Sequence, residues 1–177
     1  MFNLAKRWTR LILLGAIILT CVGCDQTTKK IASHQLSADK THSYFSDTLR
    51  FQFARNPGGF LSLGGNWNHQ VRTGIFIGIN TLFMSILFGV LIFRRKLSLK
   101  IFVCLAYILA GGIGNLIDRA SQNGLVTDFI NIGVGPVRTG IFNIADVAIM
   151  FGAIGLVVVF LLTKKQPLHL DSIPETN

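Results

Sequence analysis

Four long apolar segments constrain the fold of this chain of 177 residues more than any other feature. They cover residues 11–23, 71–93, 101–117 and 144–162. A helix needs roughly 20 mostly apolar residues to cross the hydrocarbon core of a bilayer. The last three segments approach or exceed this length, and the first reaches it with its flanks, over about residues 8–28. We therefore expect a mainly α, polytopic membrane protein with four transmembrane helices.

Charged residues are scarce and lie mostly outside these segments. Only 14% of the residues are charged and 50% are apolar, whereas a soluble domain carries about 25% charged residues. The formal net charge is +9, but the basic residues do not form the continuous stripe that a nucleic-acid site requires. We therefore expect membrane lipid, and no nucleic acid, among the partners.

Basic residues crowd three positions along the chain: before the first segment, between the second and third, and after the fourth. They are Lys6, Arg7 and Arg10; Arg94, Arg95, Lys96 and Lys100; and Lys164 and Lys165. With four crossings these positions share one side of the membrane, and the positive-inside rule makes that side cytoplasmic. On the opposite side the basic residues are spread over longer loops. The pattern predicts a multi-pass protein with cytoplasmic N- and C-termini.

Two longer loops, residues 25–70 and 118–140, then lie on the outer face. In the first loop Leu49, Phe51 and Phe53 alternate with polar residues, which is typical of a half-buried strand. The proline and glycines that follow indicate a turn. We therefore expect a small extracytoplasmic β-sheet resting on the membrane surface.

No internal repeat or low-complexity tract divides the chain. We expect a single membrane-embedded domain over residues 1–165, a disordered cytoplasmic tail over residues 166–177, and a monomer. The end of the first segment also resembles a bacterial lipoprotein signal, with Cys24 as the lipid-bearing residue. However, Cys21 stands where leucine is usual, and a secreted lipoprotein would not carry three further membrane segments. We therefore favour an uncleaved first helix.

The cysteines and histidines indicate no metal site. Cys21 and Cys24 form a C-x-x-C pair, but no second pair and no nearby histidine accompanies it. The four histidines are scattered and form no H-E-x-x-H motif. We interpret the cysteines as small apolar helix residues and expect neither a metal nor an organic cofactor.

Two aspartates lie where a membrane protein rarely carries charge. Asp146 opens the fourth apolar segment, and Asp128 lies shortly upstream in the apolar stretch 125–130. An ionised carboxylate at bilayer depth costs roughly 2.5–3.5 kcal/mol on insertion scales, so such residues are usually functional. If two carboxyl groups converge in a low-dielectric site, they tend to share one proton. A shared proton is what an aspartyl hydrolase requires.

More polar side chains gather at the outer ends of the third and fourth segments. Helical spacing places Asn115, Asp118 and Arg119 on one face, and Asn143 and Asp146 on one face of the next helix. Glycines of the third segment and small residues of the fourth would allow close packing of the two helices. These polar groups could serve only to hold the helices together, but their number exceeds that need.

Two pairings of the aspartates remain open on chemical grounds. Arg119 beside Asp118 would hold Asp118 ionised, which suits an orienting role better than proton sharing. Asp128 has no basic neighbour in the sequence, and Asp146 faces inward from its helix. We favour Asp128 with Asp146 as the pair, and Asp118 is the alternative partner.

Five motifs, in order along the chain, give a resemblance to a known family. They are Asp25-Gln-Thr-Thr-Lys29, Asn56-Pro-Gly-Gly-Phe60, Gly111-Gly-Ile-Gly-Asn-Leu-Ile-Asp-Arg119, Val126-Thr-Asp-Phe129 and Phe142-Asn-Ile-Ala-Asp146. With them the chain resembles lipoprotein signal peptidase (signal peptidase II), the intramembrane aspartyl protease of bacteria. The second motif departs from the family, because Gly59 stands where an alanine is usual and one residue fewer precedes Phe60. This departure concerns the shape of the outer loop.

The resemblance implies an aspartic endopeptidase of the bacterial inner membrane that needs no cofactor. It would remove signal peptides from diacylglyceryl-modified prolipoproteins, cutting just before the lipidated cysteine. The family's catalytic pair maps onto Asp128 and Asp146. Its substrate-binding positions map onto Asn56, Asn115, Arg119 and Asn143, and its supporting polar positions onto Asp25, Lys29 and Asp118.

Two other classes of protein also fit the composition. A small transporter or proton relay would place aspartates in its helices, but would more often show inverted repeats and broken helices. A structural membrane protein could use the same polar groups to join helices. It would then keep its function when both aspartates are replaced by asparagine.

Overall fold

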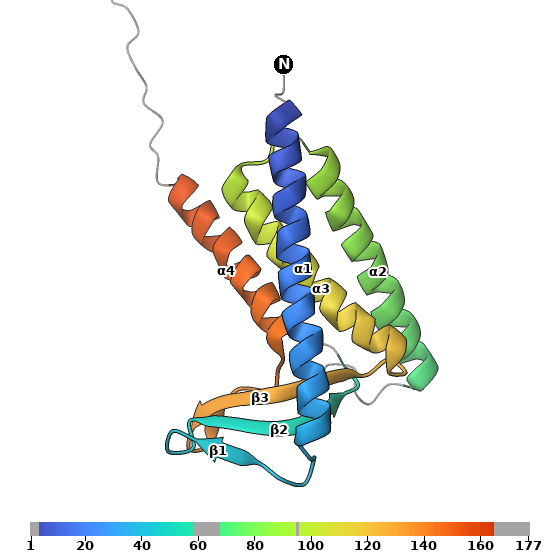
Figure 1. Ribbon diagram of the computed structural model, residues 1–177, viewed down its shortest axis with the longest axis vertical. Coiled ribbons are helices and arrows are strands. Elements are labelled where there is room, and N and C mark those ends of the chain that lie inside the picture. Colours follow the sequence, from blue (N-terminus) through green and yellow to red (C-terminus); the bar gives the residue numbers. More distant parts are fainter. Residues whose placement is uncertain (1–3, 59–67, 95, 165–177) are drawn as a thin grey trace, which may run out of the picture.

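The computed structural model describes residues 4–58, 68–94 and 96–164 (Figure 1). The described part contains helices α1 (Leu4–Gln35), α2 (His69–Phe93), α3 (Leu99–Ser121) and α4 (Ile144–Lys164). All four are long and apolar enough to cross a membrane. Together with a small antiparallel sheet they confirm the predicted fold class. The predicted tail after residue 165 and most of the predicted loop after residue 58 lie outside the described residues.

Helix α3 is the centre of the bundle and contacts each of the other three helices. Half of its membrane-spanning window is buried, against 17% or less for the others. An apolar core lies between α1, α2 and α3. It consists of Leu14, Ile17, Met84, Leu87, Leu91, Phe102, Ala106, Leu109 and Ala110. The outward faces carry exposed apolar side chains such as Phe83, Phe151 and Leu161, as a hydrocarbon environment requires.

Small residues allow α3 and α4 to approach closely, as the sequence predicts. A Cβ atom on Gly111 would collide with the main-chain oxygen of Ala145, and one on Gly152 would collide with the main-chain oxygen of Cys104. Close backbone contact of this kind is the usual basis of helix packing in membranes, because the hydrophobic effect does not drive helices together in lipid. The first turn of α4 is therefore held directly against α3.

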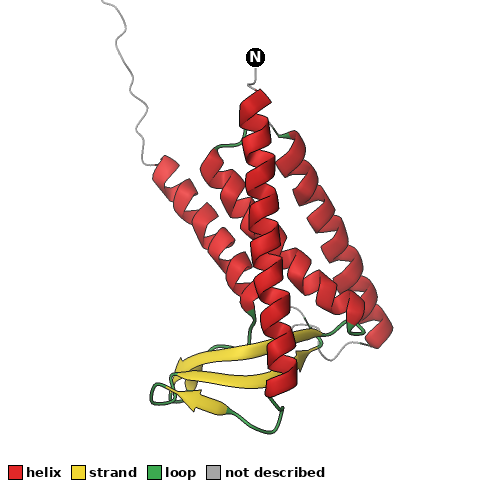
Figure 2. Cartoon of the chain, in the orientation of Figure 1, coloured by secondary structure: helices red, strands yellow, loops and turns green. Residues whose placement is uncertain are grey.

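The sheet lies across one end of the bundle (Figure 2). Its strands are β1 (His42–Tyr44), β2 (Leu49–Asn56), β3 (Val126–Val134) and β4 (Val137–Arg138), in the order β1-β2-β3-β4. The alternating residues 49–53 lie in β2, as predicted. Antiparallel pairing sets Ala54 opposite Asp128 and Asn56 opposite Val126. This register brings the end of β2 beside the start of β3.

The sheet contacts α1, α3 and the residue before α4. The backbone N–H groups of Phe129 and Ile130 both donate to the carbonyl oxygen of Phe142, just before α4, at 3.0 and 2.9 Å. Helix α1 has 32 residues, which makes it about 48 Å long at 1.5 Å per residue. Because this exceeds the thickness of a hydrocarbon core, its C-terminal part continues beside the sheet (Figure 1). The C-terminal part of α1, the strand β3 and the start of α4 therefore lie at the same end of the bundle.

Candidate active site

Polar side chains from α1, α3, β2, β3 and the start of α4 converge on one site. All nine predicted site residues belong to the described part of the chain. Seven of them are buried, and Asn56 and Asp146 are partly buried. The buried seven are Asp25, Lys29, Asn115, Asp118, Arg119, Asp128 and Asn143. So much buried polar surface is stable only when its groups are hydrogen-bonded to one another.

Asn143 and Asp146 form a reciprocal cap at the start of α4. The Asn143 side-chain oxygen accepts from the backbone N–H of Asp146 at 3.0 Å. In return, Oδ2 of Asp146 accepts from the backbone N–H of Asn143 at 3.2 Å. This is the capping-box arrangement, here with Asn and Asp at the two positions three apart. The cap fixes the direction in which the Asp146 carboxyl group points.

Asp128 lies near the start of β3 and is held by two side-chain amides. Its Oδ2 accepts from Nδ2 of Asn56 at 2.9 Å, and its Oδ1 accepts from Nδ2 of Asn143 at 2.6 Å. The strand pairing explains the first contact, because Asn56 ends the strand that runs beside Asp128. Asn56 is itself fixed, since its side-chain oxygen accepts from the Gly58 N–H at 3.0 Å.

Asn143 therefore bonds both carboxyl groups at once. Its side-chain amide donates to Asp128 and its backbone N–H donates to Asp146. The side chain is completely buried, so it has no water to exchange with these partners. The two aspartates predicted as a pair are thus hydrogen-bonded to the same residue.

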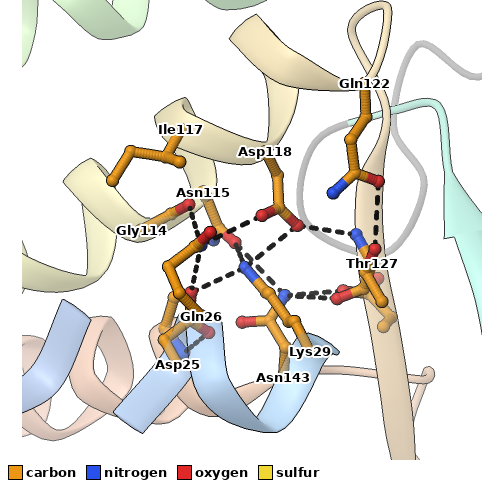
Figure 3. Close-up of polar contacts among 12 residues, drawn as sticks. Asp25, Gln26, Lys29, Gly114, Asn115, Ile117, Asp118, Gln122, Thr127 and Asn143 are labelled. Atoms are coloured by element: carbon orange, nitrogen blue, oxygen red, sulfur yellow. Dashed lines mark hydrogen bonds and ion pairs between the residues drawn. The ribbon is translucent and has the colours of Figure 1, made fainter. Parts of the chain in front are cut away.

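Asn115 links the same site to α1 (Figure 3). Its Nδ2 donates to Oδ1 of Asp146 at 2.8 Å, while its Oδ1 accepts from Nζ of Lys29 at 3.0 Å. The Asn143 amide also lies 3.2 Å from this oxygen. The chain Lys29–Asn115–Asp146 is continuous across three helices.

Lys29 is the centre of a buried ionic cluster, as Figure 3 shows. Its ammonium group lies 2.8 Å from Oδ2 of Asp25 and 3.2 Å from Oδ2 of Asp118. The two aspartates also bind backbone. Oδ1 of Asp25 accepts from the N–H of Ala145 at 2.9 Å, and Oδ2 of Asp118 accepts from the N–H of Thr127 at 2.9 Å. The cluster therefore ties α1 and α3 to the residues directly before both members of the aspartate pair.

The partner of Asp118 differs from the sequence-based expectation. We expected Arg119 to hold Asp118 ionised, but the cation beside Asp118 is Lys29 of α1. Arg119 points elsewhere: its Nη2 donates to the Gly58 carbonyl at 2.9 Å, and its guanidinium lies over the ring of Phe76. Adjacent side chains of a helix diverge by about 100°, so Asp118 and Arg119 reach different partners although both border the site. The carboxyl group of Asp118 is occupied within the ionic cluster and is not bonded to Asp128.

The surroundings of Asp128 favour its protonated form. Burial raises the pKa of this carboxyl to about 6, against the opposing effect of the hydrogen bond from Asn56. The negative charge of Asp146 raises it further. A carboxyl group with a pKa in this range exchanges its proton near neutral pH, which suits general acid–base chemistry. Among the described residues no group of three or more His, Cys, Asp or Glu side chains is arranged to hold a metal ion.

Two residues of the site escaped the sequence analysis. Gln26 donates to Oδ1 of Asp118 at 3.0 Å and to the Gly114 carbonyl at 3.1 Å, which closes the ionic cluster. Thr127 is buried and supplies the backbone N–H that Asp118 accepts. Gln26 lies inside the first motif, so its position was the available signal. For Thr127 the relevant group is main chain, which no side-chain pattern reveals.

Comparison with known proteins decides the family. Residues 17–162 match the family described as Signal peptidase (SPase) II. The chain belongs to this family. A lipoprotein signal peptidase of Citrobacter koseri is 35% identical over 164 residues, covering 90% of this chain and 93% of the relative. One of Mycobacterium leprae is 36% identical over 161 residues, covering 86% and 72%. The resemblance drawn from the five motifs is confirmed.

Solved structures of bacterial membrane enzymes share the fold of this chain. A bacterial membrane enzyme solved by the in meso method superimposes with a TM-score of 0.74 at 26% identity, covering 88% of this chain and 94% of the other. A second one, at 24% identity, gives a TM-score of 0.76 over 93% and 94% of the two chains and supports the fold. The protein is thus a multi-pass membrane protease.

Proposed function

We propose that this signal peptidase II is an aspartic endopeptidase acting on diacylglyceryl-modified bacterial prolipoproteins. It would remove the signal peptide by cutting just before the lipidated cysteine. The observation that carries the proposal is the pair Asp128 and Asp146, both hydrogen-bonded to Asn143. The names of the relatives, lipoprotein signal peptidases, supply the substrate class.

The proposed reaction is direct attack of water on the scissile carbonyl. One aspartate, ionised, takes a proton from a water molecule between the pair as its oxygen bonds to the carbonyl carbon. The other aspartate, protonated, hydrogen-bonds the carbonyl oxygen and stabilises the charge that develops there. When the C–N bond breaks, a proton passes from the pair to the leaving amine. No covalent enzyme intermediate forms, and the pair ends with the single proton with which it began.

The electrostatics of the site support a pair that keeps one proton. Two carboxylates in a buried site repel each other, so one of them holds a proton at a pH where free carboxyl groups are ionised. The raised pKa of Asp128, about 6, agrees with this requirement.

The remaining site residues receive positioning roles in this proposal. Asn56, Asn115 and Asn143 hold the two carboxyl groups, and the partly exposed Asn56 would also donate to the substrate backbone when it enters. Arg119 fixes the Gly58 carbonyl and so supports the segment that carries Asn56. The ionic cluster of Asp25, Lys29 and Asp118 fixes Asn115 and the backbone before each aspartate of the pair. All these groups come from one chain, so the site is complete in a monomer.

The position of the site suits a lipid-anchored substrate. It lies at the end of four apolar helices whose outer faces are exposed and apolar. A diacylglyceryl group anchored in the bilayer would bring the cleavage position to this depth. The distribution of basic residues supports cytoplasmic termini, with the sheet on the outer face of the inner membrane.

The proposal is tested with a purified enzyme and a diacylglyceryl-modified prolipoprotein peptide. Asp128→Asn and Asp146→Asn, each at parental membrane levels, are expected to abolish cleavage. An unlipidated peptide of the same sequence is expected to be cleaved far more slowly by the parent enzyme. If either variant still processes the lipidated peptide at the parental rate, the aspartyl mechanism is wrong. Equal rates on both peptides would contradict the substrate class.

A further inference from the structure

We propose that Lys29 decides which carboxyl group of the pair carries the shared proton, by fixing the orientation of the Asn115 amide. In this arrangement Asp146 is the ionised carboxylate that takes the proton from water, and Asp128 is the protonated acid. The inference rests on the aspartyl mechanism proposed above. It assigns a different role to each member of the pair and makes Lys29 a positioning residue.

Lys29 is a buried residue whose side chain can only donate hydrogen bonds. It is only 3% exposed, and an ammonium group carries three donors and no acceptor. Its three polar partners are Oδ2 of Asp25, Oδ2 of Asp118 and Oδ1 of Asn115, at 2.8, 3.2 and 3.0 Å. Two carboxylates already compensate its charge, so the contact with Asn115 has a separate consequence.

The ammonium group determines which way the Asn115 amide faces. Because Nζ of Lys29 can only donate, the atom of Asn115 opposite it must be the oxygen. The Asn143 amide reinforces this choice, since its Nδ2 also lies against that oxygen at 3.2 Å. The Asn115 NH₂ group is thereby left facing Oδ1 of Asp146 at 2.8 Å. An amide turned by half a rotation would present its oxygen to the carboxylate and repel it.

The two carboxyl groups consequently receive different donors. Asp146 accepts from an amide polarised by a cation, since linked hydrogen bonds strengthen one another. It also accepts from a backbone N–H at the N-terminus of α4, where the helix dipole favours negative charge. Asp128 lies on a strand and accepts from two neutral side-chain amides, those of Asn56 and Asn143. The ionised form is therefore better stabilised at Asp146.

The charges around the pair are consistent with one retained proton. Asp25 and Lys29 face it from α1, and Asp118 and Arg119 from α3. With Asp128 and Asp146 these make four carboxyl groups and two cations, so full ionisation would leave two net negative charges in a buried site. Holding one proton halves that excess. Burial raises the pKa of Asp128 to about 6, which agrees with one retained proton in the site.

The first test is the pH profile of Lys29→Gln in the full-length enzyme with the diacylglyceryl peptide. Removing a preorganised polar contact typically costs on the order of 10²-fold in rate. We expect a loss of this size in kcat/KM, and a shift of the acid limb to higher pH by about one unit, because the ionised form of the base loses a donor. Lys30→Gln removes the same charge from the exposed neighbouring position and should keep the parental profile. A slower Lys29→Gln enzyme with an unchanged profile would overturn the inference.

A double-mutant cycle separates the amide from the charge itself. If Lys29 acts through Asn115, then Lys29→Gln should cause no further shift of the acid limb in an Asn115→Ala background. Additive shifts would show that Lys29 acts on the pair without Asn115, and would overturn the proposal. Because Lys29→Gln leaves Asp25 and Asp118 without their cation, the cycle is repeated with Asp25→Asn added. That change restores the parental net charge of the cluster and keeps an oxygen for the Ala145 N–H.

A chemical probe tests the assignment on the parent enzyme. In a lipidated peptide carrying an epoxide at the scissile position, the ionised carboxylate attacks a ring carbon, the C–O bond opens, and the alkoxide takes up a proton. The product is a hydroxyalkyl ester on one aspartate, which peptide mass mapping locates. An ester on Asp146 is the expected result, and an ester on Asp128 would refute the assignment. Failure of the aspartyl mechanism itself would be distinguished by activity in Asp128→Asn or Asp146→Asn.

Discussion

Oδ1 of Asp25 accepts a hydrogen bond from the backbone N–H of Ala145 at 2.9 Å, across 120 residues of sequence. Ala145 directly precedes Asp146, so this contact fixes the start of α4 against α1. The other oxygen of Asp25 forms an ion pair with Lys29 at 2.8 Å. One carboxylate thus sets both the backbone position of Asp146 and the position of the cation that acts on it through Asn115.

Replacing Asp25 should therefore lower both stability and activity. Asp25→Ala leaves Lys29 short of a carboxylate and the Ala145 N–H without its acceptor, and breaking a buried ion pair typically costs about 3–5 kcal/mol. Asp25→Asn keeps an oxygen for Ala145 and should lose less. The measurement is thermal unfolding in detergent together with peptidase activity. Asp39→Ala, at an exposed aspartate, is the matched control, and an equally small effect of both alanine variants would contradict the prediction.

Asn143 combines two roles that different substitutions should separate. Asn143→Ala removes the cap of α4, which costs about 1 kcal/mol, and also removes the amide donor to Asp128, which should lower kcat by roughly 10²–10³-fold. Asn143→Ser keeps a capping oxygen but has no amide. We expect it to recover most of the melting temperature of the parent while remaining as inactive as the alanine variant. Parallel recovery of activity in Asn143→Ser would show that the donor to Asp128 is dispensable.

The sequence predicted the helices well because the signal for them is local. Length and apolar composition alone determine whether a segment crosses a membrane, and the alternation at residues 49–53 predicted β2 in the same way. The polar residues of the site were also found, because intramembrane charge is rare enough to stand out. Their partners were not predictable in this way. Which cation forms an ion pair with Asp118 depends on how α1 packs on α3, so adjacency in the sequence pointed to Arg119 and not to Lys29.

Main-chain partners were also beyond the reach of the sequence. The contacts of Asp25 with Ala145 and of Asp118 with Thr127 use backbone N–H groups, which every residue except proline carries. The cap of α4 could have been found, because Asn143 and Asp146 have the spacing of a capping box. The turn predicted from the proline and glycines after residue 56 lies mostly outside the described residues and stays a prediction.

Gly111 should tolerate no side chain, since a Cβ there meets the Ala145 carbonyl oxygen and the Ile149 side chain. Gly111→Ala must push the first turn of α4 away from α3 and so displace Asp146 from Asn115. We expect at least a tenfold loss of activity, because catalytic groups lose their function when they are displaced by as little as about 1 Å. Gly89→Ala is the matched control, because a Cβ there meets nothing within 4 Å. A normally active Gly111→Ala enzyme would mean that the contact between α3 and α4 does not set the site.

The raised pKa of Asp128 predicts an unusual dependence of stability on pH. The folded-state pKa is about 6, while the unfolded chain titrates near 4, so between these values the folded state binds more protons. Stability should therefore fall as the pH rises from about 4 to 6, by an amount on the order of 3 kcal/mol.

Asp47 affects stability in the opposite direction and in a lower pH range. A hydrogen bond from Arg50 holds its pKa well below the usual range, so its contribution is lost only on further acidification. Asp128→Asn should remove the slope between pH 4 and 6 and be more stable than the parent above pH 6, whereas Asp39→Asn should keep the parental slope. Chemical unfolding in detergent across this range measures both effects, and a parental slope in Asp128→Asn would show that the buried proton resides elsewhere.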